Sequence, residues 1–234
     1  MTTQPPAFSV LIREVPHIAQ LWAGRWRRVS KNLAPPNVTA ERQPILVIPG
    51  LLSRDYSTSL LRRSLKHAGY PTYNSKLGFM RGVTLSRMAR AEKRLAEIAN
   101  RHGEKVVLIG WSLGGLYARV LAQRCPDLAK MVMTLGTPFS GNRRANNAWR
   151  IYEAINDHSV DNPPISDDVS VKPPIRTVAV WSSWDGVIPP DCARGQDHER
   201  DVAIEVESRH LTFGCGRRAI DQIIPIVGEQ LAQV

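Results

Sequence analysis

The stretch KVVLIGWSLGGLYARVLAQ, residues 105–123, places a serine between two different patterns. The apolar, β-branched run before Ser112 predicts a buried strand, and the residues after it have the spacing of a helix. Gly110 and Gly114 stand two residues to either side of Ser112. Because glycine adds no side chain to a crowded strand-to-helix turn, the pattern predicts a sharp turn that exposes the serine hydroxyl.

Strand-like and helix-like segments alternate on both sides of this turn. Strands that alternate with helices are typical of parallel sheets whose two faces are covered by the helical crossovers. The sequence therefore predicts an α/β fold with one doubly wound, mostly parallel sheet of about six strands. The strands are expected at 45–50, 70–74, 105–110, 131–138, 176–185 and 201–208, and the helices at 54–68, 84–103, 113–124 and 217–233, the last kinked or broken at Pro225.

Two segments interrupt this regular pattern. Residues 1–44 form an N-terminal arm before the α/β domain of residues 45–234, and residues 139–174 are an insertion of the size expected for a cap. A short helix at 144–157 would show Trp149, Tyr152 and Ile155 on one side of the cap. A helix from Pro16 would align several apolar residues of the arm, either to pack on the domain or to contact a membrane surface: Ile18, Leu21, Trp22, Trp26 and Val29.

A serine hydroxyl is a weak nucleophile unless a base accepts its proton and a third group orients that base. Asp185 and His210 each follow a predicted strand, so they would lie with Ser112 at the carboxyl edge of the sheet. Asp191 is the nearest rival for the acid. The other five histidines fall in the arm, at helix ends, in the cap or in a polar loop. The sequence predicts a Ser112–His210–Asp185 site.

The same edge offers two backbone donors for a negatively charged oxygen. One is the N–H of Leu113, the residue after the serine, and the other is the N–H of Leu51, in the loop after the first strand. Gly50 would allow the tight turn that brings Leu51 close.

These motifs resemble those of the α/β-hydrolase superfamily, in particular its lipase- and esterase-like branch. The matching segments are PGLLS (49–53), GWSLGG (110–115), LGTPFSG (135–141), WSSWDGVIPPDC (181–192) and SRHLTFG (208–214). The resemblance implies a nucleophile (Ser112), a general base and acid (His210), an orienting carboxylate (Asp185) and oxyanion donors (Leu51 and Leu113). It also implies that Cys192 and Cys215 could be bonded. Phe139 stands where histidine is common in the branch.

Apolar residues near the predicted nucleophile favour an ester with an apolar acyl chain. Trp111 and Leu113 also fit core positions below the turn. The expected substrate-binding residues are Leu51, Leu52, Trp111, Phe139, Trp149, Trp184, Val187, Ile188 and Leu211. The predicted activity is carboxylic-ester hydrolysis through an acyl-enzyme. The alternatives are an acyltransferase with the same intermediate, and a non-catalytic module that binds anionic lipid or a protein partner.

The net charge of +10 favours anionic partners, but its arginines and lysines are scattered and form no nucleic-acid motif. The sequence also shows no metal-ligand cluster and no cofactor fingerprint, so we expect neither nucleic acid, metal nor cofactor. No apolar run approaches the length of a membrane span, and no secretory leader is evident, which predicts a cytoplasmic location. Nothing in the sequence indicates the oligomeric state.

Overall fold

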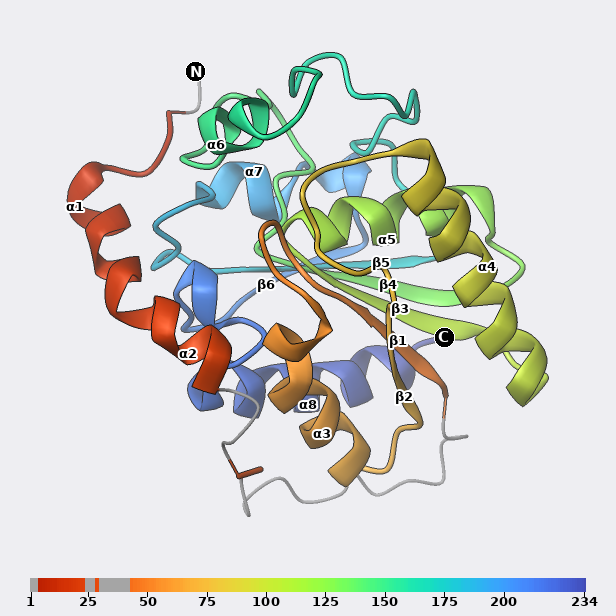
Figure 1. Cartoon of the computed structure of the whole chain (residues 1–234). Coiled ribbons are helices and arrows are strands. Elements are labelled where there is room, and N and C mark those ends of the chain that lie inside the picture. The colour runs from red at the N-terminus through yellow and green to blue at the C-terminus, as the bar shows by residue number, and fades with distance from the viewer. Residues whose placement is uncertain (1–3, 24–27, 30–42) are drawn as a thin grey trace.

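The computed structural model describes residues 4–23, 28–29 and 43–234, and six strands within them form one sheet (Figure 1). The strand order is β2-β1-β3-β4-β5-β6, and all neighbours run parallel. The predicted α/β fold with about six strands is confirmed. The strands are β1 (Ile45–Ile48), β2 (Thr72–Asn74), β3 (Val106–Trp111), β4 (Ala129–Leu135), β5 (Arg176–Trp181) and β6 (Val202–Glu205).

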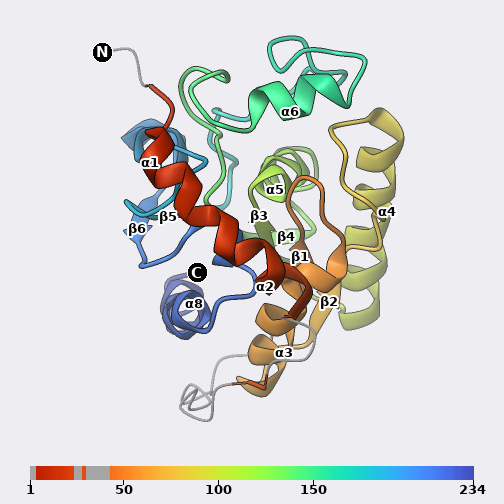
Figure 2. The same ribbon diagram turned by 60° about the vertical axis from the view of Figure 1, so that its left-hand side comes forward.

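Helices cover both faces of the sheet. Because successive strand residues point to opposite sides, neighbouring residues of one strand belong to different core clusters. Val47 belongs to the core cluster beneath α3 and α8, whereas Leu46 belongs to the cluster beneath α4 and α5. Figures 1 and 2 show these two pairs of helices on opposite sides of the sheet. The helices are α3 (Ser59–His67), α4 (Leu85–His102), α5 (Leu113–Arg124) and α8 (Arg217–Leu231).

The ends of α4 and the continuity of α8 can be explained from particular residues. Thr84 caps the start of α4 with its side chain, and Gly103 follows the end of the helix with a positive φ of 67°. Of the two alternatives predicted at Pro225, a kink or a break, the break is wrong, because the helix continues through Pro225 to Leu231. Pro225 faces solvent while Ile224 and Ile226 are buried, so core packing on both sides of the proline maintains the helix.

The insertion of residues 139–174, called the cap below, lies above α5 and α7 (Pro190–Arg194) in Figure 1. Its helix α6 (Trp149–Ala154) is shorter than the predicted 144–157, and turns and irregular chain make up the rest. The hydroxyl of Tyr152 accepts a hydrogen bond of 3.2 Å from the N–H of Val83, before α4. This bond ties the insertion to the loop that leads into α4.

A buried arginine of α5 holds the end of the same insertion. The guanidinium of Arg119 donates to the carbonyl oxygens of Val169, Ser170 and Glu199. It also lies 4.1 Å from the ring centre of Phe139, which is therefore covered by the arginine. Burial lowers the pKa of Arg119 to about 10, so the guanidinium remains charged at neutral pH.

The N-terminal arm is helical from Phe8, well before the predicted start at Pro16. It comprises α1 (Phe8–Leu11), the 3₁₀ helix η1 (Ile12–His17) and α2 (Ile18–Ala23). Figure 2 shows it crossing the front of the molecule diagonally. It contacts two 3₁₀ helices of the domain, η2 (Asp55–Thr58) and η4 (His210–Thr212).

The apolar residues predicted for one side of the arm have different surroundings. Leu21 and Val29 pack against the core, whereas Ile18 is exposed. Trp26 and the side chain of Trp22 lie outside the described residues. None of the helices in the described part of the chain has the length and apolar character that crossing a bilayer requires.

Candidate functional site

Ser112 lies in the turn between β3 and α5 with a φ of 53° and a ψ of −121°. A positive φ costs a residue with a side chain about 1–3 kcal/mol, so the surroundings must hold it. The carbonyl oxygen of Ser112 accepts bonds from the N–H of Gly115 and the hydroxyl of Thr137. A side chain at Gly110 would come within 2.3 Å of the carbonyl oxygen of Gly114. The glycines are therefore required by close backbone packing.

The structure brings Ser112, His210 and Asp185 together, and all three are buried. Nε2 of His210 lies 3.0 Å from Oγ of Ser112, and Nδ1 lies 2.8 Å from Oδ2 of Asp185. Because an ionised carboxylate only accepts hydrogen bonds, Nδ1 carries the proton in this arrangement. Nε2 is then the atom able to accept the proton of the serine hydroxyl.

The carboxylate of Asp185 is itself fixed by backbone donors. Its second oxygen, Oδ1, accepts bonds of 2.8 Å from the N–H groups of both Val187 and Ile188. Burial alone lowers the pKa of His210, but the carboxylates of Asp185 and Glu14 outweigh it and raise the pKa above its usual value. The site therefore favours the imidazolium that forms when His210 takes up a proton.

The backbone of His210 is also anchored. Its carbonyl oxygen accepts a bond of 3.0 Å from Nε1 of Trp111, the last residue of β3. Trp111 is buried in the cluster beneath α3 and α8. It thus occupies the core position that the sequence left open as an alternative to substrate binding.

The rival candidates lie elsewhere. Asp191 is on the surface of α7 and pairs with Arg194. His17 bonds to Gln20, and His102 bonds to Tyr73. His158 bonds to the hydroxyl of Tyr152 in the cap.

The loop after β1 lies directly against the serine. A side chain at Gly50 would come within 3.2 Å of Cβ of Ser112. The loop is held by two bonds with the segment before α4, from the N–H of Leu52 to Met80 and from the N–H of Met80 to Ser53. Leu113 is the first residue of α5, where the N–H has no partner within the helix.

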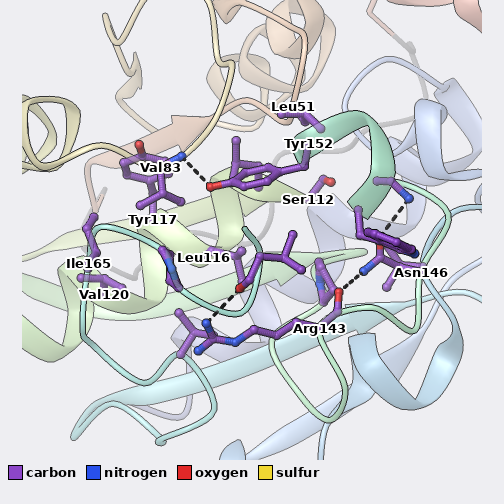
Figure 3. Close-up of a pocket in the computed structure, with 18 of the residues that line it drawn as sticks. Leu51, Val83, Ser112, Leu116, Tyr117, Val120, Arg143, Asn146, Tyr152 and Ile165 are labelled. Atoms are coloured by element: carbon purple, nitrogen blue, oxygen red, sulfur yellow. Dashed lines mark hydrogen bonds between the residues drawn. The ribbon is translucent and has the colours of Figure 1, made fainter. Parts of the chain in front are cut away.

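An apolar cavity of about 130 Å³ opens beside Ser112, between α4, α5 and the cap (Figure 3). A single water needs only about 10–15 Å³, so the cavity can hold a ligand group. Figure 3 shows Leu116 between Ser112 and the far end, where Val120 and Ile165 lie. The lining residues are Leu51, Val83, Met88, Ser112, Leu113, Leu116, Tyr117, Val120, Pro138, Arg143, Asn146, Ala148, Trp149, Tyr152, Val160, Pro163, Ile165, Asp167, Val169 and Ile188.

Three of the apolar residues expected to bind substrate line this cavity: Leu51, Trp149 and Ile188. The others lie elsewhere for identifiable reasons. Phe139 is buried under Arg119, and Val187 packs with Ile188 and Cys192 in a separate small cluster. Leu52 and Trp184 are exposed, Leu211 packs against the main core, and Trp111 lies below the turn.

Sequence reasoning missed most of the cavity wall. Leu116, Tyr117 and Val120 follow Leu113 at helical spacing, so the periodicity of α5 carried a signal for this wall. The residues from the cap gave no comparable signal, because irregular chain has no period. Glu14, which contacts the backbone of His210, was also missed.

No disulfide joins Cys192 to Cys215, so the pairing implied by the resemblance is wrong. Cys192 packs with Ala145 and Ile188, whereas Cys215 belongs to the main core and donates its Sγ–H to the carbonyl oxygen of Leu211. Burial raises the pKa of the Cys192 thiol to about 11. Among the residues that the structure describes, no three His, Cys, Asp or Glu side chains are grouped to hold a metal ion.

No protein-family model matches the chain. Solved structures with a similar fold include a monoacylglycerol lipase from Paleococcus ferrophilus. It is 18% identical to this chain, the match covers 84% of this chain and 96% of that one, and the TM-score is 0.58. Naproxen esterase from Bacillus subtilis matches at 13% identity over 96% and 100%, with a TM-score of 0.54. The thioesterase domain of the curacin biosynthetic pathway matches at 12% over 84% and 92%, with a TM-score of 0.59. At these identities the likeness concerns the fold.

Proposed function

We propose that this chain, an α/β hydrolase by its fold, is a serine esterase that cleaves carboxylic esters with an apolar acyl part. The observation that carries the proposal is the chain of hydrogen bonds Asp185–His210–Ser112, with separations of 2.8 and 3.0 Å, at the mouth of an apolar cavity. The structural neighbours include proteins named as a monoacylglycerol lipase, a naproxen esterase and a thioesterase domain, which supports the proposal of ester cleavage.

In the proposed reaction, Oγ of Ser112 attacks the ester carbonyl while Nε2 of His210 takes up the hydroxyl proton. The carbonyl oxygen becomes an oxyanion, which the N–H groups of Leu51 and Leu113 stabilise. The C–O bond to the alcohol then breaks, and the alcohol leaves with the proton from His210. Water attacks the acyl-Ser112 ester, gives its proton to His210, and the carboxylic acid departs as Ser112 recovers its proton.

The cavity makes a specific prediction about acyl length. In the wild type, kcat/KM for p-nitrophenyl esters should rise about fourfold per methylene that enters the cavity, because each buried methylene contributes about 0.8 kcal/mol. Leu116→Trp should fill the space beside Ser112 and abolish this rise while keeping acetate hydrolysis. The measurement is kcat/KM for acetate to decanoate esters.

Leu128→Trp is the matched control, because Leu128 is also partly buried but lies before β4, at the opposite edge of the sheet. It should keep the length dependence of the wild type. Equal length profiles for Leu116→Trp and wild type would show that the acyl chain binds elsewhere. No ester turnover by folded wild type would overturn the esterase proposal itself.

We also propose that the arm rests on an anionic lipid surface. Phe8, Ile12, Val15 and Ile18 are each more than half exposed, at spacings of four, three and three residues. Such a stripe is typical of a helix that lies in a membrane interface. Beside it, a groove between the arm and α8 carries the basic residues His17, Arg209, Arg217 and Arg218, together with Glu207, which pairs with Arg218. Basic side chains next to an apolar stripe match the chemistry of anionic lipid.

Vesicle sedimentation tests this proposal. The wild type should bind vesicles that contain phosphatidylserine more tightly than pure phosphatidylcholine vesicles, and salt should weaken the binding. Phe8→Ser combined with Ile12→Ser should reduce the bound fraction severalfold. Val171→Ser, at an exposed apolar residue outside the arm, should have no effect. Equal binding of the double variant and the wild type would contradict the role of the arm.

A further inference from the structure

Glu14 is an acidic residue of the arm that is almost completely buried, with 4% of its surface exposed. Its Oε1 accepts the N–H of Gly186 at 2.9 Å and the N–H of His210 at 2.8 Å. Its Oε2 accepts the N–H of Leu211 at 3.1 Å. One carboxylate thus joins the loop after Asp185, called the acid loop below, to the loop that carries His210, called the histidine loop.

The arm approaches these loops so closely that only glycine fits at position 186. A side chain there would come within 2.6 Å of the carbonyl oxygen of Val10 and 3.0 Å of Cγ of Glu14. Asn147 of the cap adds a second connection, because its Nδ2 donates to the carbonyl oxygens of both Pro6 and Gly186. Arm, cap and acid loop therefore meet beside the proposed triad.

Two carboxylates face His210, one on each side of the residue. Asp185 bonds to the ring and Glu14 bonds to the backbone N–H. The neighbouring guanidinium of Arg209 is directed away, to the carbonyl oxygen of Trp184. The hydroxyl of Ser112 bonds to Nε2 of the ring, and the indole of Trp111 lies 6.0 Å from it between ring centres. The negative charge of Glu14 therefore adds to the larger effect of Asp185 in favouring the protonated imidazole.

We propose that Glu14 is a positioning residue for the esterase reaction, which locks the acid loop and the histidine loop together and stabilises the imidazolium of His210. The inference rests on the proposed function. It assigns the arm a role in catalysis, because the contact that completes the site comes from a segment more than 90 residues before the nucleophile.

The test compares Glu14→Ala, Glu14→Gln and the control Arg13→Gln, an exposed neighbour. Glu14→Ala should lower kcat by up to about 100-fold with little change in KM, because a slightly misplaced base slows the chemical step without touching the substrate. Glu14→Gln is nearly the same shape and keeps one oxygen for the shared bonds to Gly186 and His210. It should therefore retain more activity than the alanine variant.

The pH profile separates positioning from a purely structural role. His210 must be neutral to accept the serine proton, so kcat/KM falls on the acid side as His210 becomes protonated. Removing the charge of Glu14 destabilises the imidazolium and lowers the pKa of His210. The acid limb of Glu14→Gln should therefore move to lower pH, whereas Arg13→Gln should follow the wild type.

Both effects together support the proposal. An acid limb of Glu14→Gln that coincides with the wild type, or a kcat of Glu14→Ala within twofold of the wild type, overturns it while leaving the esterase proposal intact. Absence of ester turnover in the wild type would instead overturn the proposed function. Thermal unfolding of each variant shows whether a loss of kcat comes from unfolded protein.

Discussion

Replacing Ser112 with alanine is expected to lower kcat for ester hydrolysis by about 10⁶-fold, the size of effect seen when a serine protease loses its nucleophile. The reason is that the backbone turn at Ser112, with a φ of 53°, places Oγ within 3.0 Å of Nε2 of His210, and alanine leaves no oxygen at this position. The fold should be retained or slightly stabilised, since alanine removes only a hydroxyl from the turn.

A fluorophosphonate probe followed by peptide mass spectrometry measures the same property without a chosen substrate. The wild type should carry one adduct, on Ser112, and Ser112→Ala should carry none. Ser64→Ala, at another buried serine on α3, should be labelled like the wild type. Ester turnover by Ser112→Ala at the wild-type rate would contradict the nucleophile assignment. A folded wild type without an adduct would mean that the site is closed or inactive.

The parts of this molecule that were predictable from sequence depend on local patterns. The turn at Ser112 requires glycines at fixed spacing because backbone atoms lie within 2.3–2.4 Å of where a side chain would begin at Gly110. The strands read as uninterrupted apolar runs because both faces of the sheet are covered. The proximity of Asp185 and His210 to Ser112 could be predicted because parallel strands bring the loops that follow them to one edge.

The parts that were not predictable depend on contacts between segments far apart in the chain. Phe139 was expected among the apolar residues that bind substrate, but the guanidinium of Arg119 covers it. A lone glutamate in a helical arm usually faces solvent, and only the three-dimensional packing reveals that Glu14 bonds to residues 172 and 196 positions away, Gly186 and His210. The unbroken α8 is a third case, in which tertiary packing overrides the local preference of Pro225.

Replacing Asp185 with asparagine is expected to lower kcat by about 10⁴-fold while preserving the shape of the site. The reason lies in the two sides of this carboxylate. Oδ1 accepts hydrogen bonds from two backbone N–H groups, those of Val187 and Ile188. An oxygen can accept these bonds, whereas an NH₂ group cannot. The amide of the variant must therefore turn its oxygen to the backbone and its NH₂ group to Nδ1 of His210.

An NH₂ donor at Nδ1 reverses the proton arrangement on the imidazole. Nδ1 must then accept, so the proton moves to Nε2, which can no longer take the proton of Ser112. The measurement is kcat together with the rate of fluorophosphonate labelling, and both should fall. Asp191→Asn is the matched control, since Asp191 pairs with Arg194 on the surface and should tolerate the change. If instead Asp191→Asn were inactive and Asp185→Asn active, the acid would have to be reassigned, because the hydrogen bond from His210 to Asp185 would then play no part in orienting the base.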